Sequence, residues 1–224
     1  MPRSRREPST PLNLFDRRAS RYDAWFEKPP GALQFPGEVA ALRLVLAEVP
    51  GPWLEVGAGT GRFGSALDAA AGLDPSRAML KRAKRRSLTV VQGTGDQLPF
   101  QDQTFGGVLI VFVLCFVPDP KPLLREAWRV LRAEGGIAVG AILRDSPWGR
   151  NYQEQGQRGH PLYRYAHFYS ARELESLLCD AGFRITERAC SVVQPPSRVT
   201  EEERGWWGYS QYASFIALLG RKVG

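Results

Sequence analysis

The fold is decided by one ten-residue stretch, Trp53-Leu54-Glu55-Val56-Gly57-Ala58-Gly59-Thr60-Gly61-Arg62. It begins as an apolar strand, meets an acidic residue, and then places glycines at alternate positions before a helix that starts near Thr60. Glycine adopts positive φ without strain and lets a ligand approach the backbone with no Cβ in the way. The free N–H groups and positive dipole end of the helix point into the same crevice. The stretch therefore predicts a nucleotide-binding loop between a strand and a helix.

The same stretch is also compatible with a dinucleotide ligand, because residues 59–64 match the G-x-G-x-x-G fingerprint of dinucleotide-binding enzymes. A strand that ends at Val56 instead makes Gly57 the first glycine of the turn, and the pattern then reads E-x-G-x-G-x-G from Glu55 to Gly61. That register favours another nucleotide ligand, so an NAD-dependent oxidoreductase is the less favoured alternative.

A second strand is expected to end in an acidic residue, at Asp74. In doubly wound folds a carboxylate at this place binds the two ribose hydroxyls of a nucleotide. Pro75 follows and suits the first turn of a helix, so Asp74 can also act as a helix N-cap. The two roles are compatible, and Asp74 is the predicted ribose ligand.

These motifs together resemble the class I S-adenosylmethionine-dependent methyltransferases, a broad family that includes menaquinone and ubiquinone C-methyltransferases and many small-molecule methyltransferases. The resemblance covers roughly residues 15 to 220 and consists of several motifs in the expected order. After the glycine loop they are Gly93–Phe100, Thr104–Leu114, Val117–Pro120, Arg129–Gly136 with its "R-V-L-x-P-G-G"-like run, and Phe168–Ser170 followed by Ala181–Phe183.

The chain alternates short β-branched runs with helical patterns, which is typical of an α/β protein with a parallel sheet. The resemblance implies a Rossmann-like, doubly wound sheet of seven strands, mostly parallel with the last strand antiparallel, in a single domain with an N-terminal helical lid. We expect a flexible basic tail at 1–14 and a methyltransferase domain at 15–224, with lid helices at 15–48 and a substrate-side insert at 144–169. The strands are expected near 52–57, 70–74, 88–92, 106–112, 136–143, 183–193 and 211–219.

The resemblance also implies a cofactor, S-adenosylmethionine, whose demethylated product is S-adenosylhomocysteine. Met79 is expected to pack against the adenine, Thr94 to accept from its exocyclic amine where many relatives carry Asp, and the Ile110 carbonyl to hold the amino group. Glu55 either orients the glycine loop or receives the amino group through water. The predicted cofactor-binding residues are Tyr22, Glu55, Gly57, Ala58, Gly59, Asp74, Pro75, Met79, Thr94, Gly95 and Ile110.

Residues 15–23 resemble the family's lid helix, with its signature "F-D-x-x-A-x-x-Y-D". Tyr22 is expected to close the pocket with its ring and to reach the cofactor carboxylate with its hydroxyl, with Arg18 one turn back. Methyl transfer is an in-line displacement that mainly requires alignment and the exclusion of water, so a catalytic base is optional. The catalytic candidates are Tyr22 and His167. Cys115 stands where quinone-type relatives commonly have His, which weakens the quinone analogy.

The substrate-side insert mixes aromatic residues with arginines, which favours an acceptor with a flat apolar part and an anionic group; a purely structural lid is the alternative. The predicted activity is methyl transfer to a small-molecule acceptor. A non-catalytic S-adenosylmethionine-binding regulatory or assembly protein stays open, because no obvious base is present. The acceptor atom and the oligomeric state are not fixed by the sequence.

Charge and cysteine content limit the partners. The formal net charge is +7, but the basic excess lies in residues 1–21 and 77–86, and no aromatic-lined basic groove is apparent, so no nucleic-acid partner is expected. The longest apolar run, residues 108–117, is too short to span a bilayer and is typical of a buried central strand. Three cysteines without metal-ligand spacing predict no metal site and a reducing compartment, the cytoplasm.

Overall fold

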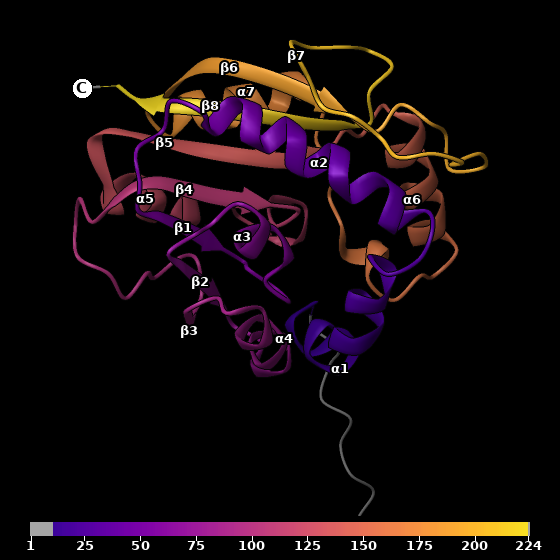
Figure 1. Ribbon diagram of the computed structural model, residues 1–224, viewed down its shortest axis with the longest axis horizontal. Helices are drawn as coiled ribbons and strands as arrows, with labels where there is room; N and C mark the ends of the chain where they lie inside the picture. Colours follow the sequence, from indigo (N-terminus) through magenta and orange to yellow (C-terminus); the bar gives the residue numbers. More distant parts are fainter. Residues whose placement is uncertain (1–10, 224) are drawn as a thin grey trace, which may run out of the picture.

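A computed structural model describes residues 11–223 as alternating helices and strands (Figure 1). The helices are α1 (Pro11–Trp25), α2 (Gly31–Leu46), α3 (Arg62–Ala66), α4 (Arg77–Ala83), α5 (Lys121–Val130), α6 (Pro147–Gln157) and α7 (Ala171–Asp180), with short 3-10 helices η1 (Lys84–Arg86), η2 (Leu114–Phe116) and η3 (Tyr163–Tyr165). The strands are β1 (Trp53–Val56), β2 (Ala71–Asp74), β3 (Val90–Gln92), β4 (Phe105–Val111), β5 (Leu131–Ile142), β6 (Phe183–Ser191), β7 (Trp206–Trp207) and β8 (Phe215–Lys222).

The sheet confirms the predicted Rossmann-like α/β architecture. Its order is β3-β2-β1-β4-β5-β8-β6-β7, and β1 to β5 pair in parallel. The last strand, β8, runs antiparallel to both of its neighbours, β5 and β6. The reversal between β3 and β4 along the chain places β1 and β4 side by side at the centre of the sheet. That is the topological switch point where doubly wound folds bind ligands.

The predicted number of strands was wrong by one, because the described part of the sheet has eight strands. The additional strand is β7, which consists of two residues and pairs antiparallel with β6 through Ala189 and Trp207. Two residues are too few to show a period-2 pattern, so the sequence gives no signal for β7. The other differences lie at the ends of strands: β5 begins five residues before its predicted start, and β8 begins four residues after its own.

The core lies on both faces of the sheet. All seven residues of β4 are buried, as predicted for a central strand. Val108 and Ile110 pack with leucines of α5 and α7 on one face, whereas Leu109 and Val111 pack with residues of α2 and α3 on the other. Successive side chains of a strand point to opposite faces, so one continuous apolar run supplies both halves of the core.

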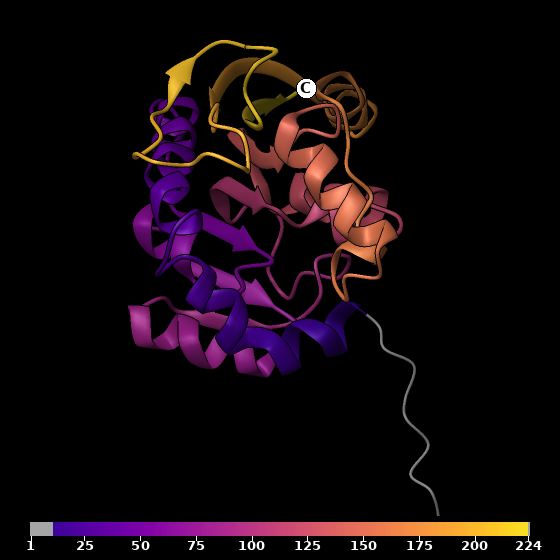
Figure 2. The ribbon, with the colours of Figure 1, turned by 90° about the vertical axis from the view of Figure 1, so that its right-hand side faces the viewer.

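The N-terminal helix α1 and the segment around α6 lie near the same end of the sheet (Figures 1 and 2). α1 contacts α4, the helix that follows β2, whereas α6 follows β5 and contacts η3. α1 begins at Pro11, four residues before the predicted domain boundary, while residues 1–10 of the predicted basic tail lie outside the described residues. Helical segments far apart in the sequence thereby meet at the ligand-binding edge of the sheet.

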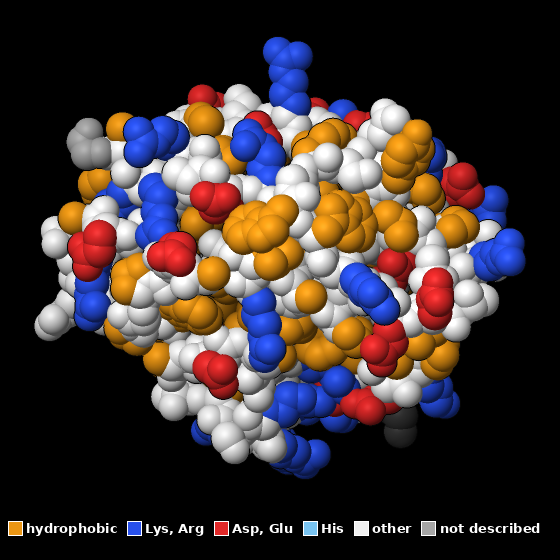
Figure 3. Space-filling view, turned by 45° about the horizontal axis from the view of Figure 1, so that its top comes forward, with side chains coloured by type: hydrophobic (Ala, Val, Ile, Leu, Met, Phe, Trp, Pro, Cys, Tyr) orange, Lys and Arg blue, Asp and Glu red, His pale blue; other side chains and the backbone are white. Residues whose placement is uncertain are grey.

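Basic and acidic side chains are intermixed, with apolar groups between them, on the face shown in Figure 3. Within residues 11–223, no helix has both the length and the apolar character needed to cross a membrane. Across the same described stretch, no group of three or more His, Cys, Asp or Glu residues is arranged to hold a metal ion.

Gly61 tests how the glycine loop supports the fold. Its φ is +78°, and a Cβ there would lie 2.8 Å from the Cβ and 2.9 Å from the Cα of Ala83 in α4. We expect Gly61→Ala to lower the free energy of unfolding by about 2–4 kcal/mol, because left-handed strain and overpacking add. The matched control is Gly159→Ala, since Gly159 has φ +87° and no neighbour within 4 Å. It should cost only about 1 kcal/mol. Urea unfolding of both variants measures the difference, and equal losses would contradict the packing argument.

Candidate active site

A cavity of about 690 Å³ lies at the carboxyl ends of the central strands. One wall comes from the glycine loop and the residues after β2 and β4, and the other walls come from α1, α2, α6 and the segment around η3. The lining is mostly apolar and aromatic, with a small number of polar groups. Such a composition is typical of small-molecule sites, in which apolar walls provide binding energy and few polar groups fix orientation.

The glycine loop has the predicted register. β1 ends at Val56, and Gly57, Gly59 and Gly61 all adopt positive φ. A Cβ on Gly59 would point into open space, with only the Tyr22 ring near it, at 3.8 Å. The α3 helix after the loop is short, with five residues from Arg62 to Ala66. The space between Gly59 and Tyr22 fits a ligand that passes close to the backbone, as an adenosyl group with a methionine chain would.

Asp74 ends β2 and lines the cavity while it also holds the loop in place. Its Oδ2 accepts from the backbone N–H of Gly59 at 2.9 Å, and its Oδ1 accepts from the N–H of Ser76 at 2.8 Å. Burial raises the pKa of Asp74, although the two backbone hydrogen bonds lower it in part. Each carboxylate oxygen keeps a further lone pair, so the group can accept from two ligand hydroxyls as well.

Glu55 lies in β1 and contacts the helix that follows the glycine loop, so of its two predicted roles the geometry is compatible with the first. Its side chain is 2% exposed and accepts from the N–H of Gly64 at 2.9 Å, and it is not among the residues that line the cavity. Burial raises the pKa of Glu55 to about 8, against the hydrogen bond from Gly64, which lowers it. In either protonation state, the Glu55 carboxyl can accept this hydrogen bond, which joins β1 to α3.

The remaining predicted cofactor residues divide into two groups. Pro75 and Met79 line the cavity next to Asp74. Four others do not line it: Ala58, Thr94, Gly95 and Ile110. Thr94 is exposed, Gly95 is crowded by Leu123 and Val56, and Ile110 is buried in β4. The residues that line the cavity after β4 are instead Val111 to Val117. The cofactor roles of all eleven residues stay predictions.

The lid helix α1 brings Tyr22 into the cavity, as predicted, and Phe15 and Arg18 line it from the same helix. The Tyr22 ring contacts Phe26 edge-on at a centroid distance of 5.5 Å. Burial raises the pKa of Tyr22 far above its ordinary value, and the charge of Glu55 adds to the shift. The phenol therefore stays protonated and can donate a hydrogen bond to a ligand.

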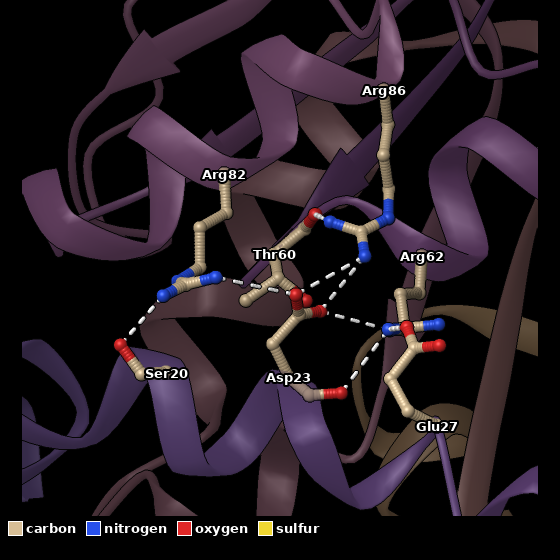
Figure 4. A network of polar contacts seen from close by, with 7 residues as sticks. All are labelled: Ser20, Asp23, Glu27, Thr60, Arg62, Arg82 and Arg86. Carbon is tan, nitrogen blue, oxygen red and sulfur yellow. Dashed lines mark hydrogen bonds and ion pairs between the residues drawn. The ribbon is translucent and has the colours of Figure 1, made fainter.

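The next residue, Asp23, fastens α1 to the glycine loop and to α4 (Figure 4). Its carboxylate accepts from Arg62 Nε at 2.9 Å, from Arg86 Nη2 at 3.0 Å and from Arg82 Nη1 at 3.4 Å. Burial raises the pKa of Asp23, but the hydrogen bonds from Arg62 and Arg86 outweigh burial and hold it below its ordinary value. Arg62 also pairs with Glu27. We call Asp23 with Arg62, Arg82 and Arg86 the lid anchor.

A second contact fastens the lid at Asp16, seven residues before Asp23 on α1. The Asp16 carboxylate accepts from Ser76 Oγ at 2.7 Å and from the N–H of Ala78 at 3.0 Å. Ser76 itself caps α4 by accepting from the N–H of Met79. The backbone hydrogen bond from Ala78 lowers the pKa of Asp16, and that from Ser76 adds to the effect. The lid is thereby joined to the N-terminus of the helix that carries Met79.

The opposite end of the cavity is lined by the predicted insert. α6 begins at Pro147 after the N-cap Ser146, whose Oγ accepts from the N–H of Gly149. The helix supplies Trp148 and Tyr152, whose ring centroids lie 5.4 Å apart, and Tyr152 lies 4.4 Å from Tyr163 of η3. This end of the cavity is an aromatic box suited to a flat apolar group.

The structure does not bring His167 into the cavity. Its side chain is exposed and lies edge-on to Tyr169 at 4.6 Å. The other histidine, His160, lines the cavity instead and stacks on Tyr163 at 4.4 Å. Cys115 also lines it, and burial raises the pKa of its thiol to about 12, so the thiol is neutral. Of the two catalytic candidates, only Tyr22 lies where a substrate could reach it.

Two polar residues of the cavity were not predicted from the sequence. Gln34 and Glu38 lie four residues apart on α2, and both are buried and line the cavity. Burial raises the pKa of Glu38 to about 8, and the charge of Glu203 adds to it. Their spacing places both side chains on one face of a helix, and this spacing is the only sequence feature that indicates a shared site.

Comparisons with known proteins agree with this geometry. A family model described as a methyltransferase domain matches residues 54–139. An uncharacterized protein of Mycobacterium tuberculosis is 43% identical over 203 residues, which cover 90% of this chain and 71% of that protein. An uncharacterized protein of Methanocaldococcus jannaschii is 34% identical over 212 residues, which cover 95% of this chain and 100% of that protein.

A solved structure from Thermotoga maritima, described as an S-adenosylmethionine-dependent methyltransferase and possible histamine N-methyltransferase, is 32% identical. It superimposes with a TM-score of 0.84, covering 95% of this chain and 100% of the other. The sheet order and the glycine loop beside Asp74 define a Rossmann-like, nucleotide-binding protein. With these relatives, the chain belongs to the class I S-adenosylmethionine-dependent methyltransferases.

The lid anchor can be tested by Asp23→Ala. We expect it to lower the free energy of unfolding by about 2 kcal/mol, between an exposed and a fully buried ion pair, because three arginines lose their carboxylate. Amide hydrogen exchange in α1 should become faster at the same time. The control is Glu27→Ala, since the Glu27 side chain is 62% exposed and pairs with Arg62 alone. Its cost should stay below about 1 kcal/mol. Unchanged exchange in α1 of the Asp23 variant would contradict the anchor.

The raised pKa of Glu38 predicts a specific dependence of stability on pH. Between pH 4.5 and about 8 the folded protein keeps a proton that the unfolded chain releases, so the free energy of unfolding falls as pH rises. Relative to Glu38→Gln, the wild type should lose up to about 1.4 kcal/mol per pH unit within that window. Urea unfolding at pH 5, 6, 7 and 8 measures this, and the comparison removes the contribution of Glu55. Parallel curves for the two proteins would refute it.

Proposed function

We propose that this protein transfers a methyl group from S-adenosylmethionine to a small-molecule acceptor. The observation that carries the proposal is that one cavity joins the glycine loop and Asp74 at one end to the aromatic box at the other. A donor bound over the loop and an acceptor in the box would share one enclosed space. Holding two reactants in line in such a space supplies a large part of the rate acceleration of a displacement reaction.

The chain's own residues provide binding, orientation and the exclusion of water. In this proposal Asp74 accepts from the ribose hydroxyls, and the backbone at Gly59 lies against the methionine chain. Met79 packs on the adenine, while Tyr22 donates to the carboxylate and covers the methyl group. Bound there, S-adenosylmethionine supplies an electrophilic methyl group on a sulfonium. The aromatic walls keep water from competing for it.

The name of the Thermotoga relative supports a small acceptor, since histamine is a small molecule. The volume of about 690 Å³ is likewise in the range of small-molecule sites. No observation specifically favours a protein that binds the cofactor without turnover. An NAD-dependent oxidoreductase is not favoured either. The family match and the register of the glycine loop both favour S-adenosylmethionine over NAD.

Ligand binding tests the proposal directly. In isothermal titration, S-adenosylmethionine and S-adenosylhomocysteine should bind to the purified protein, and NAD should not. Asp74→Ala should weaken S-adenosylhomocysteine at least about tenfold, because charge-assisted hydrogen bonds of about 1.5–3 kcal/mol are lost. The control is Asp180→Ala, at the exposed end of α7. Incubation with methyl-labelled donor and a metabolite extract then separates enzyme from binding protein. Failure to bind either adenosyl compound at millimolar concentration would end the proposal.

A further inference from the structure

One acidic side chain in the cavity has no part in the chemistry described so far, namely Glu38. It lies on α2, it is 5% exposed, and its charge raises the pKa of both Tyr22 and Tyr152, after the larger effect of burial. Within residues 11–223 no hydrogen bond or ion pair reaches its carboxylate. A buried carboxylate without a partner costs several kcal/mol, so the fold would be more stable with Gln or Leu here.

A second carboxylate increases this cost. Glu203 is also buried, and its charge adds to the raised pKa of Glu38. Glu203 has a structural partner, because its Oε1 accepts from the N–H of Gln194 at 2.8 Å, and it does not line the cavity. In the free protein burial and the charge of Glu203 thus favour the protonated form of Glu38. A cation bound beside Glu38 would favour its ionised form, because an opposite charge stabilises a carboxylate.

The cavity that Glu38 lines suits an organic cation rather than a metal ion, because aromatic rings line it as well, among them Tyr22 and Tyr152, whose pKa values the charge of Glu38 raises. Trp25 lies edge-on to Trp148 at 6.3 Å, and Trp148 lies 5.4 Å from Tyr152. Faces of such rings attract ammonium groups, most strongly where water is excluded. Metal sites of oxygen ligands need several oxygens, but Glu38 is a single carboxylate in a cavity that is lined mostly by apolar and aromatic side chains. The combination points to an ammonium group attached to an apolar body.

Gln34 lies one turn before Glu38 and adds a second polar group. Its side chain is 4% exposed and lines the cavity, and its amide nitrogen has no hydrogen-bond partner. An amide presents either its N–H₂ or its oxygen when it turns over, so it can accept from an ammonium that Glu38 also holds. Two adjacent polar groups on one helical face without protein partners indicate a ligand group that satisfies both.

The arginines of the insert do not support the anionic acceptor that the sequence favoured, because none of its four arginines lines the cavity. The arginines that do line it, Arg18 and Arg21, come from α1. They lie near His160: burial lowers the pKa of this histidine, and the charges of both arginines lower it further. They offer a place for a cofactor carboxylate at the lid, whereas the α2 wall is acidic.

We propose that the acceptor is a primary or secondary amine on a flat apolar body, and that Glu38 binds its ammonium group and takes a proton from it. The proposal rests on the methyltransferase function proposed above. The aromatic box holds the body of the acceptor, and Gln34 accepts a second hydrogen bond from the nitrogen. Glu38 touches the reacting nitrogen and is therefore a catalytic residue of this site.

The proton transfer is necessary for the reaction. An ammonium nitrogen has no free electron pair, so one N–H bond breaks first, and its proton goes to a Glu38 oxygen. The freed electron pair of nitrogen then forms a bond to the methyl carbon. The carbon–sulfur bond breaks as this occurs, and its electron pair stays on sulfur. The positive charge passes from the sulfonium to the methylated nitrogen, so atoms and charge balance.

The test uses the full chain saturated with S-adenosylhomocysteine, to which matched probes are added. The probes are 2-phenylethylamine and tryptamine as amines, 2-phenylethanol as a neutral analogue and 3-phenylpropanoate as an anion. We expect the amines to raise the melting temperature further by mass action, and the alcohol and carboxylate to have little effect. With methyl-labelled donor, mass spectrometry should detect the N-methylated amine.

Variants identify the group responsible. Glu38→Gln should weaken amine binding at least tenfold and abolish N-methylation, while S-adenosylhomocysteine affinity stays within twofold. Glu38→Asp should restore part of the amine binding. The matched control is Glu203→Gln, which removes the neighbouring charge but keeps an oxygen for the N–H of Gln194, and it should keep amine binding. The melting temperature of each variant without added amine checks that it folds. We expect it to lie close to the wild-type value or above it.

The outcomes separate the two proposals. Binding of S-adenosylhomocysteine with no effect of either amine, or with preference for the alcohol or the carboxylate, would overturn the amine acceptor and leave the methyltransferase function standing. The same conclusion follows if Glu38→Gln keeps full amine affinity. Failure of the wild type to bind S-adenosylhomocysteine would overturn both proposals.

Discussion

The site depends on the two hydrogen bonds that the Asp74 carboxylate accepts from Gly59 and Ser76. They join the end of β2 to the glycine turn after β1 and to the start of α4. Ser76 then donates to Asp16, so the same set of contacts extends to the lid helix. The loop and the helix after β2 therefore meet at one buried acidic residue at the end of a strand, and Ser76 connects them to the lid. A ligand hydroxyl bound to Asp74 would join this set rather than create it.

Much of the fold could be predicted because its signals are local. The continuous apolar run of β4 and the glycines after Val56 each determine a conformation within a few residues. The two-residue strand β7 and the early start of β5 depend on pairing with distant strands, which no local pattern records. Asp74 could be located because a strand end has a sequence signature. Glu38 could not, because its importance comes from the aromatic side chains of α6, more than 100 residues away in the chain.

The basic cluster at residues 77–86 contributes to the packing of the lid as well as to the charge of the surface. Arg82 and Arg86 turn toward α1 and contact Asp23, so they neutralise a buried carboxylate of the lid. The partly buried guanidinium groups contribute more than exposed ones would, because solvent screens them less. Part of the positive charge of the chain thus has a structural use, which reduces the excess available to an acidic partner.

The lid anchor has a consequence for how fast the enzyme can work. If the proposed reactants enter and leave beneath α1, the helix has to move, and that movement would separate Asp23 from its three arginines. Opening and methyl transfer are then separate steps with separate barriers, and departure of the spent cofactor can limit turnover. In that case natural variation in the arginines of the anchor would tune the catalytic rate without altering any group that touches the reacting atoms.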